Sequence, residues 1–208
     1  MKKFIVIDGF DGSGKDTQAQ VVYEMYKNKV SENSETNKSN KANDTIKNVV
    51  LRSNPETDNY FGLKSHGALL KEGKINKIIA TIFFALDIFR SLILYYHKTD
   101  VLIFTRYLLT PAYFPKRMVK PVYKFFSFIL PTSNFMFYLD LPPEVAMERI
   151  NTRNKRDNQE FQSFENLESL KKTREKVNLI SSDWIKIDGS KDKNEIKEKI
   201  ENILLNND

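Results

Sequence analysis

A short apolar run, followed by clustered glycines and a lysine, constrains the fold of this chain more than any other feature. Phe4 to Ile7 is a β-branched, apolar segment that indicates a buried strand. The chain then passes through Gly9, Gly12 and Gly14 to Lys15, after which the polar and apolar residues alternate as in a helix. A strand, a glycine-rich turn, a lysine and a helix in this order are typical of a P-loop, and the glycine and lysine spacing matches that motif.

Such a loop binds phosphate mainly through its backbone. Glycines let the chain curl until several N–H groups point into one concavity, and the helix start adds a partial positive charge. Asp16 follows the lysine where Ser or Thr is usual, and Thr17 comes next. A carboxylate there can hold Mg²⁺ directly or through water, can repel phosphate, or can merely complement the helix dipole.

The composition restricts the class of protein. With 208 residues the chain is long enough for one α/β domain with a sizeable core. The absence of cysteine excludes a disulfide scaffold and thiolate metal sites, and it suits a cytoplasmic location. The net charge of +6 is compatible with phosphate handling or with nucleic acid. No RNA- or DNA-binding motif is present, so we expect no nucleic-acid partner.

Further apolar segments alternate with helical patterns along the chain. After the first strand we expect strands at residues 49–51, 101–104, 134–139 and 184–188. We expect helices at residues 15–27, 62–71, 78–96, 143–150, 159–180 and 192–205, the last of them capped by Asp192. Prolines should break residues 108–130 into short helices. Five strands alternating with helices predict an α/β fold, a parallel sheet with helices on both faces.

Two segments differ from the rest of the chain in composition, one because it is almost entirely polar and the other because it is almost entirely apolar. Residues 29–47 are almost entirely polar, so we expect an exposed, disordered insertion that cannot bury enough apolar surface to offset its ordering entropy. Residues 78–96 are apolar except for Asp87 and Arg90, each of which would cost about 2.5–3.5 kcal/mol at the centre of a membrane span. We therefore expect no membrane span but a helix buried on most sides. Asp87 and Arg90 would pair or point together into a polar pocket.

Several stretches resemble the thymidylate kinase family of P-loop nucleoside-monophosphate kinases. The resemblance lies in residues 5–18, in Tyr138-Leu-Asp-Leu-Pro-Pro-Glu144, in the basic segment after Arg149 and in Ile187-Asp-Gly-Ser190. It covers nearly the whole chain and implies one three-layer P-loop kinase domain over residues 1–208, with a basic lid at about residues 149–160. It also implies transfer of the ATP γ-phosphate to dTMP, giving dTDP and ADP, with Mg²⁺ as cofactor and a homodimer as the assembly.

The resemblance suggests roles for individual residues. The loop that would hold ATP consists of Gly9, Asp11, Gly12, Ser13, Gly14, Lys15, Asp16 and Thr17, with Asp16 and Thr17 nearest the metal. Asp11 also matches the carboxylate that approaches the acceptor sugar. The acceptor would meet Arg52, Phe83 or Phe84, Asp87, Arg90, Arg106 and Tyr107. The catalytic cations would be Lys15, Arg106, Arg149, Arg153 and Arg156.

Three departures from the family pattern leave the acceptor open. Thr105 replaces the Asp of Asp-Arg-Tyr, and a carboxylate lost there and gained at Asp16 would serve the same Mg²⁺. Ser53-Asn54 precede the proline of Arg-Glu-Pro, so Arg52 is displaced by one residue. The base-reading arginine position is Asp87 or Ile88. A kinase of another nucleotide or nucleoside, and a nucleotide-binding regulatory protein that has lost catalysis, therefore remain alternatives.

Overall fold

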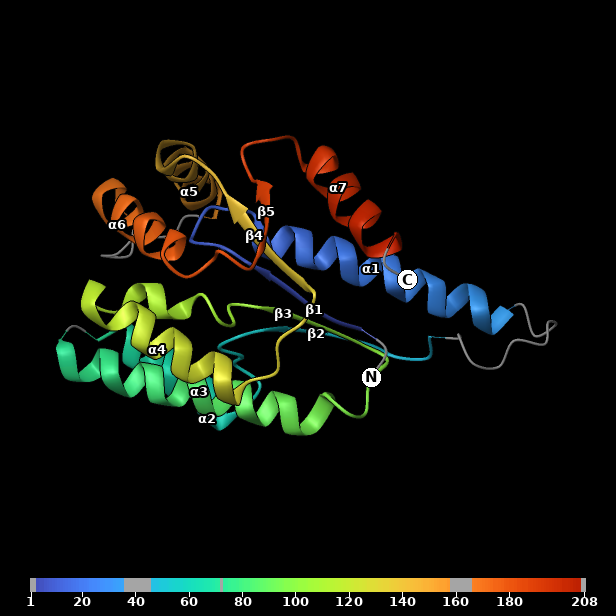
Figure 1. Ribbon diagram of the computed structural model, residues 1–208, viewed down its shortest axis with the longest axis horizontal. Helices are drawn as coiled ribbons and strands as arrows, with labels where there is room; N and C mark the ends of the chain where they lie inside the picture. The colour runs from blue at the N-terminus through green and yellow to red at the C-terminus, as the bar shows by residue number, and fades with distance from the viewer. Residues whose placement is uncertain (1–2, 36–45, 72, 158–165, 207–208) are drawn as a thin grey trace. The chain divides into compact units, whose positions relative to one another are not determined.

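The strands form a five-stranded parallel sheet with the strand order β2-β3-β1-β4-β5 (Figure 1). The computed structural model describes residues 3–35, 46–71, 73–157 and 166–206. The strands are β1 (Lys3–Asp8), β2 (Val49–Ser53), β3 (Val101–Thr105), β4 (Phe135–Asp140) and β5 (Ile185–Asp188). All five were predicted to within about two residues because their apolar runs are short and bounded by polar residues.

The helices alternate with the strands, and the α/β prediction is confirmed. They are α1 (Lys15–Glu35), α2 (Tyr60–Leu69), α3 (Lys74–Tyr95), the short 3-10 helix η1 (Thr110–Tyr113), α4 (Lys116–Ile129), α5 (Pro143–Asp157), α6 (Leu167–Asn178) and α7 (Lys193–Leu205). Asp192 caps α7 as predicted, because its Oδ1 accepts from the backbone N–H of Asn194 at 2.8 Å.

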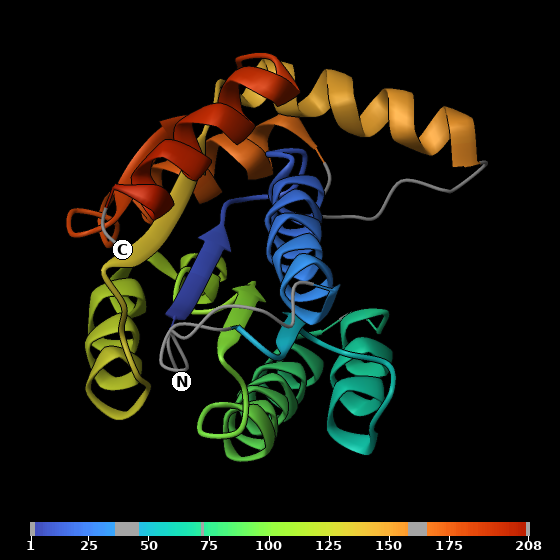
Figure 2. The same ribbon diagram turned by 90° about the vertical axis from the view of Figure 1, so that its right-hand side faces the viewer.

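The chain divides into two compact units, and the prediction of a single domain stays a prediction. The first unit comprises Met1–Ile5 and Ala19–Tyr107. Within it, β2 pairs with β3 in a register that sets Ser53 opposite Thr105. Helices α2 and α3 lie side by side in both views (Figure 1 and Figure 2). Its core includes Phe4, whose ring meets those of Phe104 and Tyr107 edge to face.

The second unit comprises Val6–Gln18 and Leu108–Asp208. Strand β4 pairs with β5, and this register sets Asp140 opposite Asp188. Phe10 belongs to the loop that follows β1. It packs with buried apolar residues of α5, of α6 and of the segment just before α5, namely Leu141, Ala146, Ile150 and Leu170. The loop is therefore anchored on the hydrophobic core of its own unit, which keeps its backbone in one conformation.

Several predicted helix boundaries are wrong. Helix α1 continues to Glu35 instead of ending near Lys27, so it includes the first residues of the predicted insertion at 29–47; residues 36–45 lie outside the described part. Helix α5 continues to Asp157 through most of the predicted lid, and the rest of that lid lies outside the described part. Neither stretch contains Gly or Pro, so a polar helix continues at low cost. Pro121 sits within α4, where it removes one hydrogen bond without ending the helix.

The prediction that the helix over residues 78–96 is buried on most sides is also wrong. Only 33% of the window Ile78–Tyr95 is buried, and its mean hydropathy is 2.0. In the described part of the chain, α3 is the one helix that is long and apolar enough to cross a membrane. This is weak evidence for a membrane span, because core helices of soluble proteins pass the same test. The isoleucines of α3 that are more than half exposed are Ile75, Ile78, Ile82 and Ile93.

Candidate functional site

The loop between β1 and α1 forms a tight backbone curl in the second unit. Gly12 and Gly14 have φ angles of 81° and 85°, which L side chains rarely adopt. A Cβ on Gly12 would lie 2.6 Å from the carbonyl oxygen of Ala146, and a Cβ on Gly9 would lie 2.6 Å from Ser13 Oγ. The glycines found in the sequence are therefore required by the turn itself and by the close approach of α5.

Two side chains in this curl have polar atoms that fit a phosphate group. Ser13 is 1% exposed, and within the described residues its Oγ has no hydrogen-bond partner. Lys15 is 3% exposed, and its Nζ makes long contacts with Asp11 Oδ1 at 3.4 Å and with the Phe10 carbonyl oxygen at 3.5 Å. A buried hydroxyl without a partner costs free energy, and an anionic oxygen at the loop would satisfy it. The residues present therefore fit a phosphate chain.

The carboxylates near the loop differ in their surroundings. Asp11 accepts from Lys15 at one oxygen and from the Tyr113 hydroxyl, at 3.2 Å, at the other. Asp16 and Thr17 are exposed in the first turn of α1. The described residues contain no group of three or more His, Cys, Asp or Glu that could hold a metal. A Mg²⁺ here would therefore take Asp16 or Thr17 together with phosphate and water oxygens, a mixture that suits this ion.

The three arginines of the predicted lid lie on α5 and have different partners. Arg149 donates from Nη1 to the Gly189 carbonyl oxygen at 2.8 Å, which ties α5 to the turn after β5. Arg153 donates to the Asn154 side chain, and Arg156 pairs with Asp157 at 2.7 Å. The Arg156 side chain is 75% exposed. Their catalytic role stays a prediction.

The sequence reasoning missed two buried carboxylates at strand ends of the second unit. Asp8, at the end of β1, accepts from the backbone N–H groups of Gly9 at 2.8 Å and Leu109 at 3.3 Å. It therefore holds the start of the phosphate loop against the segment after β3. An acid directly following a buried strand at the ligand-binding edge of a parallel sheet is the signal that would have found it.

Asp140, at the end of β4, is the second of these carboxylates. It accepts from Arg174 at 2.7 and 2.9 Å, from Lys186 at 2.8 Å and from the Tyr138 hydroxyl at 2.9 Å. Burial alone would raise the pKa of Asp140, but these donors lower it to about 2. Burial raises the pKa of Tyr138, and the neighbouring Asp140 charge raises it further. Asp140 thus joins β4, β5 and α6.

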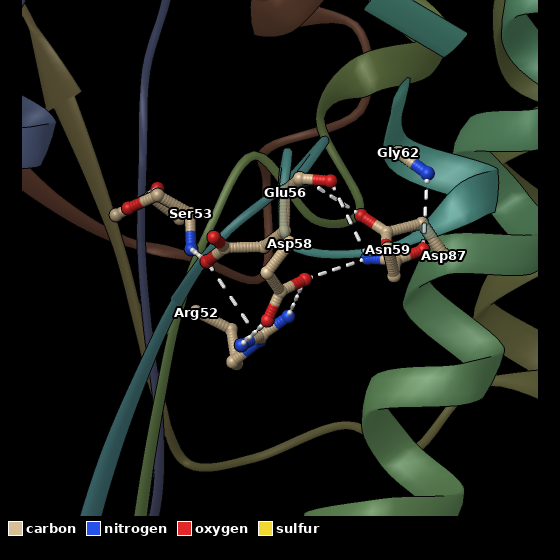
Figure 3. A network of polar contacts seen from close by, with 8 residues as sticks. Arg52, Ser53, Glu56, Asp58, Asn59, Gly62 and Asp87 are labelled. Carbon is tan, nitrogen blue, oxygen red and sulfur yellow. Dashed lines mark hydrogen bonds and ion pairs between the residues drawn. The ribbon is translucent and has the colours of Figure 1, made fainter. Parts of the chain in front are cut away.

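In the first unit, Arg52 is held by the protein's own carboxylates (Figure 3). It is 7% exposed, and its two terminal nitrogens donate to the two oxygens of Asp58 at 3.0 and 3.1 Å. Its guanidinium also lies 5.3 Å from the centre of the Tyr95 ring. Hydrogen bonds from Arg52 and then Asn59 lower the pKa of Asp58 to about 2. Any substrate contact of Arg52 would therefore compete with this pair.

Asp87 fastens the loop after β2 to helix α3 (Figure 3). It is 0% exposed and accepts from the backbone N–H of Glu56 at 2.8 Å and from Asn59 Nδ2 at 2.7 Å. Asn59 in turn caps α2, because its Oδ1 accepts from the N–H groups of Phe61 and Gly62. The buried carboxylate thus positions the loop through both of its oxygens, a role that the sequence did not reveal.

Arg90 and Asn54 are two residues of this region that have buried polar atoms without hydrogen-bond partners among the described residues. No hydrogen bond or ion pair joins Arg90 to Asp87 within the described residues, and Arg90 Nη1 is buried without a hydrogen-bond partner there. Asn54 is 0% exposed, and neither atom of its amide has a partner in the same residues. Ile88 is 2% exposed. At the family's base-reading position, Asp87 already accepts hydrogen bonds from the loop and Ile88 is apolar, so neither supplies the donors of an arginine.

The aromatic candidates are buried to different degrees. Phe84 is 8% exposed and belongs to the core of the first unit. Phe83 is partly exposed and meets the rings of Tyr60 and Phe61 at 6.0 and 6.4 Å. Tyr107 is 2% exposed, and burial raises the pKa of its hydroxyl. Of these rings, Phe83 is the one with surface left for stacking on a base.

Thr105 is the last residue of strand β3 and Arg106 follows it, at the position of the family's Asp-Arg-Tyr motif. Thr105 is 0% exposed, and its hydroxyl donates to Ser53 Oγ at 3.1 Å across the strand pair. Two of the three departures from the family pattern, Thr105 and Ser53, are thus joined through their neutral hydroxyl groups. Arg106 has a φ of 51° and is the one non-glycine residue with a positive φ among the described residues. A non-glycine in this conformation stores strain that is common at functional sites.

A parallel sheet whose first strand leads through a glycine-rich turn and a lysine into a helix is the architecture that defines the P-loop class of proteins. The family model for thymidylate kinase matches residues 7–200, and the chain belongs to the thymidylate kinase family. Over 217 aligned positions it is 28% identical to "Probable thymidylate kinase 1" of Saccharolobus solfataricus, a match that covers 100% of this chain and 99% of that protein. The resemblance noted in the sequence is thereby confirmed.

Proposed function

We propose that this protein transfers the γ-phosphate of ATP to dTMP, giving dTDP and ADP. Membership of the thymidylate kinase family supports a nucleoside-monophosphate kinase. The observation that carries most weight is the glycine curl with its two buried polar side chains. Among the described residues Ser13 Oγ has no hydrogen-bond partner, and Lys15 is a buried cation, so both can bind an anion. A phosphate is the ligand that satisfies both groups at once.

Phosphoryl transfer needs little covalent chemistry from the protein. Lys15 and the loop N–H groups would hold the donor phosphates, and Arg106 would hold the acceptor phosphate, whose oxygen is itself the nucleophile. Mg²⁺ held by Asp16 or Thr17 with the phosphates would neutralise charge on the transferred group. Arg153 and Arg156 would add positive charge near that group and exclude water. No strong general base is required, because the acceptor phosphate is already ionised.

A second candidate is a kinase with another nucleotide or nucleoside as acceptor. The burial of Ile88 and the internal use of Asp87 favour it, because they leave α3 without an arginine at the position that selects thymine. A regulatory protein that binds ATP without transferring phosphate is the third. Thr105 and Asp16 favour this reading, since both change residues near the metal.

An acceptor panel in a coupled ADP-release assay separates these candidates. The panel contains dTMP, dUMP, dCMP, the ribonucleoside monophosphates and thymidine, each with Mg-ATP. Highest kcat/KM with dTMP supports the proposal, and a preference for another acceptor supports the second candidate. ATP binding by calorimetry without ADP release from any acceptor supports the third. Lys15→Ala serves as the blank for contaminating kinases.

We further propose a cytoplasmic homodimer formed through α3. Its exposed isoleucines at 75, 78 and 82 follow helical spacing on one side, and Ile75 and Ile78 are 73% and 58% exposed. This stripe carries no charge, so a copy of itself is a suitable partner. Analytical ultracentrifugation of Ile78→Asp/Ile82→Asp should give a monomer where the unchanged chain gives a dimer.

A further inference from the structure

Helix α4 presents a face that phosphoryl transfer does not use. The inner side packs on its unit through Val119, which is 0% exposed, and through Tyr123, whose hydroxyl oxygen accepts from Trp184 Nε1 at 3.1 Å. On the outer side Phe128 is 89% exposed and Phe125 is 61% exposed. Two exposed phenylalanines on neighbouring turns are unusual for a surface that meets only water.

The exposed residues of α4 form two parallel stripes. The apolar stripe consists of Met118, Pro121, Phe125 and Phe128. The basic stripe consists of Arg117, Lys120 and Lys124. In both, successive members are three or four residues apart and therefore align along the helix, and each basic residue precedes an apolar one by one position. All are exposed, and α4 contains no Asp or Glu.

We propose that this side of α4 docks on the surface of an anionic lipid bilayer. A helix with aromatic and aliphatic residues on one side and lysine or arginine beside them lies in the plane of the lipid interface. The apolar stripe would enter the boundary between headgroups and acyl chains, and the basic stripe would lie among the anionic headgroups. Such docking is peripheral and does not require any helix to span the membrane.

A second copy of the chain fits this surface less well than lipid. Two copies related by a two-fold axis would bring both basic stripes into or beside one contact, and α4 offers no acidic residue to offset them. The uncharged isoleucines of α3 lack this conflict. A nucleic acid also fits less well, because Met118 and Pro121 offer neither a stacking ring nor a hydrogen-bond donor to bases. The net charge of +6 further favours an anionic surface.

Sedimentation of the full-length protein with vesicles tests the proposal. The vesicles are pure phosphatidylcholine or phosphatidylcholine mixed with phosphatidylglycerol, each at low and high salt. We expect binding to the anionic vesicles that weakens as salt rises. Phe125→Ser/Phe128→Ser and, separately, Lys120→Ser/Lys124→Ser should each weaken binding by about tenfold or more. Far-UV circular dichroism and ADP release check that each variant is folded.

Matched controls remove the same chemistry elsewhere in the second unit. Lys191→Ser/Lys199→Ser removes two exposed charges, and Leu179→Ser/Leu205→Ser removes two apolar side chains that are 37% and 48% exposed. Both controls should bind vesicles as the unchanged chain does. Absent vesicle binding, or equal loss in the controls, overturns the proposal. The proposal is also overturned if the phenylalanine variant changes the oligomeric state, since the occupant of α4 is then a second copy of the chain. It is likewise overturned if the variants lose binding to RNA but not to vesicles, since the occupant is then a nucleic acid.

Discussion

Replacing Asp140 by Asn tests whether the carboxylate that joins β4, β5 and α6 stabilises the fold through its charge. Arg174 and Lys186 contact it at 2.7 and 2.8 Å, and its side chain is 8% exposed. Asparagine keeps the shape and one acceptor oxygen but loses the charge. The substitution therefore isolates the electrostatic part of this cluster.

The expected magnitude follows from the pKa of Asp140, which falls from 3.8 to about 2 in the folded chain. A difference of one in pKa corresponds to about 1.4 kcal/mol, so the charge contributes up to about 2.5 kcal/mol at neutral pH. The partly exposed cations are screened by solvent, which reduces the expected cost of Asp140→Asn to about 2 kcal/mol.

The contribution depends on pH in a direction that can be measured. Because the folded pKa lies below the unfolded one, the stabilisation is fully present well above pH 3.8 and is lost as the pH falls toward about 2. Urea unfolding followed by circular dichroism at pH 7, 5, 4 and 3 measures the difference in free energy of unfolding between the two proteins. This difference should be nearly the same at pH 7 and 5, slightly smaller at pH 4 and about half as large at pH 3.

A matched surface pair provides the control. Glu144 pairs with Lys171 at 2.9 Å, but both side chains are more than half exposed. Glu144→Gln should therefore leave the free energy of unfolding nearly unchanged at every pH. The reasoning about Asp140 is refuted if Asp140→Asn costs no more than this control at pH 7, or if its cost stays constant down to pH 3.

Three further substitutions probe the loop after β1 in the second unit and the loop after β2 in the first unit. Lys15→Ala should lower kcat by at least about a hundredfold in the ADP-release assay while the melting temperature stays within a few degrees, because in the proposed function the lysine binds the donor phosphates. Gly12→Ala should abolish ATP binding in calorimetry, since its φ of 81° and the 2.6 Å approach of a backbone oxygen exclude a Cβ; unchanged affinity would contradict the observed curl. Asp87→Ala should destabilise the fold by about 2–3 kcal/mol and raise the acceptor KM more than the ATP KM, because Glu56 N–H and Asn59 lose their acceptor. Equal changes in both KM values would show that the loop does not serve the acceptor.

Features that depend on neighbouring residues were predictable from the sequence. The glycine loop, the strands and the Asp192 cap each follow from spacing over a few residues, because turn geometry, strand alternation and capping are local. Helix ends were less predictable. The polar residues after Lys27 and after Ile150 are compatible with both helix and loop, and no Gly or Pro marks a stop.

Burial of α3 depended on the tertiary structure. Its apolar composition predicted a helix covered on most sides, but composition does not tell which sides other elements cover. The same limit applies to the aromatic residues of α4, whose inner and outer sides the sequence does not distinguish. The structure places Val119 inward and Phe128 outward, a division that helical spacing allows but does not choose.

The sequence by itself determined the parallel α/β class, the phosphate loop and the family of this protein, because each rests on order and spacing along the chain. Only the tertiary structure decided what the buried acids do. Asp87 meets Asn59 across 28 residues, and Asp140 meets Arg174 across 34. Such partners are selected by the path of the folded chain, since a buried charge is tolerated only where the fold brings donors to it.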